Sequence, residues 1–404
     1  MSEKAKNERG SITHARLHFA QPYAEGYKDW LYGRKYTAGT ITGLFRLLRR
    51  WTDLVHRAGF NLDTIHAGYD ASAKVLKGTQ VTEARLRAGA LFIQYLQELG
   101  KVPSRPQPPS ETEIWPILGA YEDWMTVHRG VTESTLLVYR SAAVIPLLEK
   151  LGDDAKAYSV RAIREFVLER GRPYGHSYAK LVTTATRSFL RYLSATGQSP
   201  AGREYAVPGF NGSRSKPADF VVKEDIERLL ASCRGKNQLR DRAIILLLAR
   251  LGLRASEVAN LEFGQVDWTR GRFTIAGKSR RMSFLPLPQE VGDALIAYIE
   301  EARPPLKTPR IFLRSCAPYA SLPACSVYSL VTRVMQRSGI DFPRKGPHIL
   351  RHSAATTMLK QGVSLEGIGA VLRHRSIRMT MHYAKVDFEL LSEIAQPWAG
   401  RSAC

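Results

Sequence analysis

Apolar residues recur at a helical period over most of the chain. They fall at i, i+3, i+4 and i+7, or at part of that spacing, in three runs: Leu44, Leu47, Leu48 and Trp51; Phe189, Tyr192 and Leu193; and Ile226, Leu229 and Leu230. This spacing predicts amphipathic helices with one buried face. A further run at 243–249, AIILLLA, is apolar throughout and lies between Arg242 and Arg250. It predicts a buried helix that is too short to span a bilayer.

The pattern changes at two short segments of the C-terminal half. RFTIAG at 272–277 and MSFLPL at 282–287 resemble strands and are separated by the polar residues KSRR. They predict a β-hairpin or the edge of a small sheet. Helical patterns resume from Ser326 to the end. The sequence therefore predicts a mainly α protein with a small antiparallel β-sheet.

Two breaks divide the chain. PSRPQPPS at 103–110 is rich in proline, and VPGFNGSRSKPA at 207–218 combines glycine, proline, serine and cations, as exposed linkers do. We expect five parts: an extra N-terminal helical domain at 1–104, a second helical domain at 111–203, a linker at 204–217, the largest domain at 218–387, and a tail helix at 388–404.

The first two parts share short segments. TAGT at 37–40 matches TEST at 132–135, and FIQYLQELGKVP at 92–103 matches FLRYLSATGQSP at 189–200, with offsets of 95 and 97 residues. A nearly constant offset favours a duplicated unit. Coincidence between two amphipathic helices remains the alternative.

The charge of the chain points to a polyanionic partner. It has 59 Lys and Arg against 37 Asp and Glu, a net charge of +22. Nucleic acid is the leading candidate, ahead of an anionic membrane surface. The N-terminal residues contain no apolar signal segment, so we expect a cytoplasmic, nucleoid-associated protein. Four cysteines without a CxxC pair argue against a disulfide framework and a zinc ribbon.

Candidate chemistry lies in four clusters. In LARLGLRASEVANL at 248–261, Arg254 follows the end of one helix near Gly252 and precedes another. It can present its guanidinium to a phosphate or simply pair with Glu257. In GKSRR at 277–281, ordinary phosphate contact or plain solvation explains the cations. Alternatively, Lys278 protonates a leaving oxygen, because neighbouring cations lower the pKa of an amine.

The other two clusters contain histidines. HILRH at 348–352 opens a helix, so that His348 and Arg351 share one face near a helix N-terminus. A zinc site there lacks the glutamate that should follow the first histidine, since Ile349 occupies that place. In LRHRSIRMTMHY at 372–383, cations surround His374 and favour the phenolate of Tyr383.

Together the clusters hold arginines, a lysine, histidines and a tyrosine, without a carboxylate pair or a set of metal ligands. This combination is typical of phosphoryl transfer in which cations stabilise the developing charge, so we expect neither metal nor cofactor. A tyrosine that attacks a DNA phosphodiester retains the bond energy as a phosphotyrosyl ester, so that strands can be rejoined without ATP.

The order of these motifs resembles the tyrosine recombinase, or phage lambda integrase, family over about 222–387. The resemblance implies that Arg254 and Arg351 clamp the scissile phosphate and that Lys278 is the general acid on the 5′ oxygen. It also implies that His348 assists as acid or base, that His374 donates a hydrogen bond to the phosphate, and that Tyr383 is the nucleophile. In one departure from the family, Arg373 stands where glycine is usual; another is a hairpin tip that carries Arg280 and Arg281. We expect DNA contacts from four further cations: Arg280, Arg281, Arg373 and Arg375.

The resemblance also implies a clamp around double-stranded DNA, formed by a core-binding domain at 111–203 and the catalytic domain. The implied assembly is a homotetramer, or a mixed tetramer with related recombinases, without a membrane partner. The tail, whose apolar residues repeat at helical spacing, packs on its own domain or docks on a neighbouring protomer. Two other functions remain open: DNA relaxation like that of type IB topoisomerases, and DNA binding by an accessory protein that does not cleave.

Overall fold

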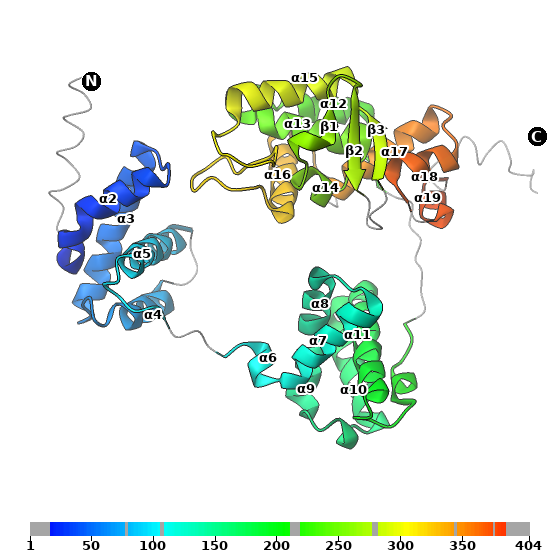
Figure 1. The fold of residues 1–404 in the computed structure, drawn as a ribbon, viewed down its shortest axis with the longest axis horizontal. Coiled ribbons are helices and arrows are strands. Elements are labelled where there is room, and N and C mark those ends of the chain that lie inside the picture. The colour runs from blue at the N-terminus through cyan, green and yellow to red at the C-terminus, as the bar shows by residue number, and fades with distance from the viewer. Residues whose placement is uncertain are drawn as a thin grey trace, which may run out of the picture. The chain divides into compact units, whose positions relative to one another are not determined.

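The computed structural model describes residues 17–76, 80–105, 109–210, 219–276, 282–342, 346–374 and 376–384 (Figure 1). The N-terminal, middle and C-terminal parts each have a hydrophobic core, and a smaller fourth cluster in the C-terminal part contains Ala355, Ile368 and Leu372. Residues Ser104–Arg214 form one compact unit. The predicted tail at 388–404 and most of the predicted linker lie outside the described residues, and the expected domain boundaries stay predictions.

The N-terminal part is helical. After a 3-10 turn, η1 (His18–Tyr23), its described residues form the helices α2 (Ala24–Gly33), α3 (Ala38–Arg57), α4 (Ile65–Val75) and α5 (Gln80–Glu98). Helix α3 begins after Thr37, whose side-chain oxygen accepts a hydrogen bond from the backbone N–H of Thr40. The predicted apolar face points inward, and Trp51 is fully buried, where its indole N–H donates to Ser72 Oγ at 3.1 Å.

The middle part is also helical. Its elements are α6 (Glu111–Ile114), α7 (Pro116–Arg129), α8 (Glu133–Tyr139), α9 (Ile145–Leu151), α10 (Val160–Gly171) and α11 (His176–Ala195). A π-helical segment, Arg140–Val144, joins α8 to α9 without a break. Phe189 and Leu193 of α11 are fully buried, and Tyr192 nearly so, as the apolar spacing predicts.

The C-terminal part surrounds α13 (Leu239–Leu251), in which residues 243–249 are almost entirely inaccessible to solvent. The run predicted to be a buried helix is therefore one. The other helices of this part are α12 (Lys223–Ala231), α14 (Ala255–Ala259), α15 (Gln289–Ala297), α16 (Ala324–Arg337), α17 (Pro347–Lys360), α18 (Leu365–Leu372) and α19 (Ile377–Ala384). Helix α13 packs against α15 and α17.

The C-terminal part also holds a three-stranded antiparallel sheet in the order β1 (Val266–Asp267), β2 (Arg272–Ala276) and β3 (Met282–Pro286). The predicted hairpin is confirmed, with Phe273 opposite Leu285 and both side chains buried. The sequence did not reveal β1, because a strand of two residues is too short for an alternating pattern. The predicted fold class, mainly α with a small antiparallel sheet, is correct. In the described ranges no helix is both long and apolar enough to cross a membrane.

Candidate active site

Arg254 lies at the start of α14, where the sequence predicted a junction of two helices. Helix α13 ends at Leu251, and Gly252 turns the chain with φ +58°. The backbone N–H of Arg254 donates to Glu257 Oε2 at 2.7 Å, and its Nη1 donates to Oε1 at 2.8 Å. Its Nη2 also donates to the carbonyl of Arg373 at 3.4 Å. The pair with Glu257 thus coexists with a contact to the turn after α18.

Arg351 joins the ends of two other helices to α17. Its side chain is buried, with 4% of the residue exposed. Nη1 donates to the carbonyl of Gly252 and Nη2 donates to the carbonyl of Leu372. These two carbonyls lie at the C-terminal ends of α13 and α18, where helix carbonyls lack intrahelical partners and carry partial negative charge. Arg351 therefore satisfies both helix ends and holds them beside the turn that carries Arg254.

His374 follows α18 directly. Its backbone N–H donates to the carbonyl of Gly369 at 2.9 Å, and its ring Nδ1 shares a hydrogen bond with Thr380 Oγ1, also at 2.9 Å. Burial, followed by the nearby charges of Arg351 and Arg254, lowers the pKa of His374 to about 4. The imidazole is therefore neutral at pH 7.

His348 lies in the first turn of α17, after Gly346 and Pro347. Burial lowers its pKa, and the charges of Arg351 and Arg254 lower it further. The rings of His348 and His352 lie 5.9 Å apart between centroids. Within the described residues, no group of His, Cys, Asp and Glu could hold a metal ion.

Arg373 ends α18 in the left-handed conformation, with φ +54°. Its Nη2 donates to Glu257 Oε2 at 2.6 Å and its Nη1 donates to the carbonyl of Val371 at 2.9 Å. Only 5% of its side chain is exposed, and only 10% of that of Glu257. Burial alone would raise the pKa of Glu257, but Arg373 and Arg254 outweigh it and lower that pKa. This position favours a supporting role for Arg373, and its expected contact with DNA stays a prediction.

The structure thus brings four of the six predicted catalytic residues together: Arg254, His348, Arg351 and His374. The fifth, Tyr383, lies on α19, which packs against α17 and α18, and its side chain is outside the described set. The sixth, Lys278, also lies outside the described residues, as do Arg280, Arg281 and Arg375.

The sequence patterns did not indicate that Gly252 and Thr380 support the site. A Cβ added to Gly252 would come within 2.5 Å of Leu372 Cδ2, so any other residue there would displace the buried side chain of Leu372. The sequence signal for this role of Gly252 is its place directly after the apolar helix α13. Thr380 is fully buried and positions the ring of His374. Nothing in the sequence distinguishes this threonine from the others.

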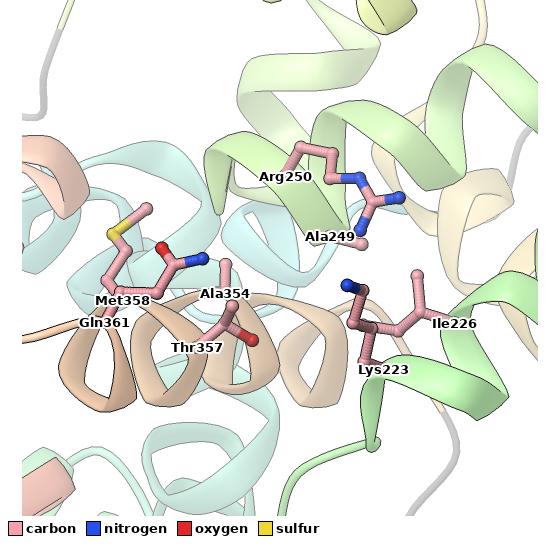
Figure 2. A pocket seen from close by; sticks show the side chains of 8 residues that line it. All are labelled: Lys223, Ile226, Ala249, Arg250, Ala354, Thr357, Met358 and Gln361. Atoms are coloured by element: carbon pink, nitrogen blue, oxygen red, sulfur yellow. The ribbon is translucent and has the colours of Figure 1, made fainter.

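A hollow of 440 Å³ lies elsewhere on the same helices (Figure 2). Figure 2 shows Lys223 and Arg250 on one side of it and Thr357, Met358 and Gln361 of α17 on the other. The guanidinium of Arg250 is paired with Glu227 at 2.7 Å and Glu290 at 3.0 Å. None of the four residues brought together lines this hollow, which is therefore separate from the candidate active site.

Comparison with known proteins gives the family. The sequence profile of the phage integrase family matches residues 219–389. The protein y4rA of Sinorhizobium fredii, described as an integrase/recombinase, is 34% identical over 390 residues, covering 94% of this chain and 95% of the relative. The chain belongs to the phage integrase family. It is a tyrosine recombinase, an enzyme that cuts and rejoins DNA strands in site-specific recombination.

Solved structures share the fold of this recombinase at low sequence identity. XerH recombinase in its post-cleavage complex with a palindromic difH substrate matches with a TM-score of 0.57 and 19% identity, over 73% of this chain and 91% of that one. The Tn1549 transposon integrase in complex with transposon right end DNA matches with a TM-score of 0.53 and 14% identity, over 68% and 99%. These likenesses establish the tyrosine-recombinase fold.

Proposed function

We propose that this recombinase cleaves each strand through Tyr383, which forms a covalent 3′-phosphotyrosyl bond and releases a 5′ hydroxyl. The hydroxyl of the partner strand then attacks that bond and releases the tyrosine. Exchange of one pair of strands gives a Holliday junction, and exchange of the second pair resolves it. No bond energy is lost in either transfer, so ATP is not required.

The arrangement of Arg254 and Arg351 carries the proposal. Their guanidiniums approach one turn of the chain from two different helices, through the carbonyls of Arg373 and Leu372. Two fixed cations stabilise the additional negative charge that a phosphodiester gains as a nucleophile attacks it. A site built for metal-assisted hydrolysis would present carboxylates instead. The carboxylate that is bonded to Arg254, that of Glu257, is already engaged by two arginines.

The lowered pKa values of the two histidines support their proposed roles. His348 is neutral at pH 7 and can accept the proton that Tyr383 loses. When Thr380 Oγ1 donates to Nδ1 of His374, the ring carries its proton on Nε2 and donates it to a non-bridging phosphate oxygen. Lys278 supplies the proton for the leaving 5′ oxygen. The base and the acid are then different groups, as an in-line displacement needs.

A nicked suicide substrate tests this mechanism. The wild-type chain should form a protein–DNA adduct that survives denaturation, because the short leaving strand diffuses away before rejoining. Tyr383→Phe should form none, while its affinity for DNA stays within about twofold, since the aromatic ring remains. An adduct with the phenylalanine variant would refute the assignment. Binding without any wild-type adduct would favour the accessory protein, and relaxation of supercoiled DNA without synapsis would favour the topoisomerase-like activity.

The partners belong to the same proposal. The Tn1549 integrase structure contains transposon DNA, and y4rA is described as an integrase, so we propose integration, excision or transposition of a mobile element as the role. The DNA partner is a duplex that carries a specific recombination site. Four protomers, of this chain alone or with related recombinases, assemble on two such duplexes.

A further inference from the structure

The outer face of α3 in the N-terminal part carries a row of arginines. Arg46, Arg50 and Arg57 lie within a narrow arc of the helix surface at 3.6 residues per turn, and Arg49 flanks them; all four are exposed. Two glycines, Gly39 and Gly43, precede them on the same side, and a Cβ added to either would meet nothing within 4 Å. This face therefore offers bare backbone followed by four guanidiniums.

These arginines have no carboxylate partner among the described residues. The one carboxylate of α3, that of Asp53, is bonded to His18 Nε2 at 2.5 Å. Elsewhere in the same part, Arg34 pairs with Glu98 at 2.7 Å. Like charges at i, i+3 and i, i+4 destabilise a helix. Arg46 is therefore repelled by Arg49 and Arg50, and a bound polyanion would relieve this repulsion; Asp53 lies on the same face between Arg50 and Arg57.

The fold of this part does not require the arginines, as the middle part shows. Each part contains an aromatic cluster of the same kind. Tyr27 meets Phe92 edge-to-face at 5.3 Å and 85°, and Tyr121 meets Phe189 in the same way at 5.2 Å and 88°. These matched pairs support the duplication expected from the sequence.

The matching helical stretch of the middle part, Glu133–Leu151, has two cations, and both are paired. Arg140 contacts Glu122 at 2.6 Å, and Lys150 contacts Glu169. This stretch of the middle part therefore packs in a similar core with both of its cations neutralised. The core of such a unit thus does not depend on the unpaired arginines of α3.

We propose that the outer face of α3 is a second DNA-binding surface, which contacts the phosphate backbone of duplex DNA through Arg46, Arg50 and Arg57. These arginines extend over about 16 Å of helix, at 1.5 Å per residue. The guanidinium group matches phosphate geometry in a two-pronged contact, and the two glycines let the helix backbone approach the duplex. The inference rests on the proposed function in one respect, that the polyanion at hand is DNA.

The test compares two triple variants of the full chain. Arg46→Gln/Arg50→Gln/Arg57→Gln removes the row, and Lys35→Gln/Lys74→Gln/Lys101→Gln removes the same charge from three other exposed positions of the same part. The affinity for a random-sequence duplex is measured at a series of KCl concentrations. Each lost phosphate contact should reduce the slope of log K against log salt by about 0.9, so the arginine variant should lose about 2 to 3 and the lysine variant less than one.

Three outcomes would overturn the proposal. The slope of log K against log salt could stay unchanged in the arginine variant. It could also fall equally in both variants, which would indicate a general effect of charge and no specific binding surface. Binding to phosphatidylserine vesicles could fall while binding to DNA does not, which would indicate a membrane surface. Circular dichroism melting confirms that both variants fold. If wild type forms no adduct on the nicked substrate but the slopes differ as expected, the proposed cleavage mechanism is wrong and the proposed DNA-binding surface on α3 is supported.

Discussion

At the scale of single residues, Glu257 connects two arginines of the site, although it has no proposed catalytic role. It accepts hydrogen bonds from the backbone and guanidinium of Arg254 and from the guanidinium of Arg373. One buried carboxylate thus fixes a proposed phosphate clamp and the turn that precedes His374. The charge of Arg373, which stands where glycine is usual, is therefore neutralised by Glu257 inside the protein.

Substitution of Arg373 should separate its charge from its backbone conformation. Arg373→Ala removes a partner of buried Glu257 and keeps a Cβ in the left-handed region. We expect it to lower the free energy of unfolding by about 2 to 3 kcal/mol, less than for a fully broken buried pair because Arg254 remains. Arg373→Gly should recover about 1 kcal/mol of that loss, since glycine adopts this conformation without strain. Urea unfolding measures both, and an alanine variant as stable as the glycine variant would contradict this account.

At the scale of elements, the site depends on the close approach of two helix ends, which a side chain of a third helix joins. Gly252 ends α13 beside Leu372 at the end of α18, and Arg351 of α17 donates to the carbonyls of both. A side chain at Gly252 would separate these ends. Glycine is thus favoured at position 252 for two reasons: the positive φ, and the short distance to Leu372.

Gly252→Ala should therefore be costly. The left-handed conformation costs about 1 kcal/mol for alanine, and overpacking against Leu372 costs about 1 to 3 kcal/mol more. We expect a loss of about 2 to 4 kcal/mol in the free energy of unfolding, together with slower adduct formation as Arg351 is displaced. Gly271→Ala is the matched control, because Gly271 also has a left-handed φ, +57°, and a Cβ there meets nothing within 4 Å, so this variant should lose only the strain of about 1 kcal/mol. Equal melting temperatures for the two variants would refute the requirement for space.

At the scale of the whole molecule, we propose that several protomers assemble on DNA and that the tail joins them. Deletion of residues 385–404 should leave the affinity of one protomer for DNA within a fewfold but reduce the fraction of multimers. The reason is that an apolar helix docked in trans contributes burial that one protomer cannot supply. Sedimentation of protein–DNA complexes measures the change. Undiminished assembly would mean that the tail packs on its own domain.

Several features of this recombinase follow from the sequence alone. The apolar runs fixed the existence of α3, α11, α12 and α13, because burial of a periodic face depends on local spacing. The hairpin followed from two alternating segments around a polar tip, and the net charge of +22 pointed to DNA. The order of the four motifs indicated the family, which the relatives confirm.

Only the tertiary structure decided how these motifs meet. Arg254 and Arg373 lie 119 residues apart in the chain, and no local rule predicts that Glu257 joins them. The burial that lowers the pKa of His374 comes from packing of α17, α18 and α19, and so does its contact with Thr380. Sequence patterns report which residues are buried along one element. Contacts between side chains of different elements depend on how those elements pack, which each element's own pattern does not contain.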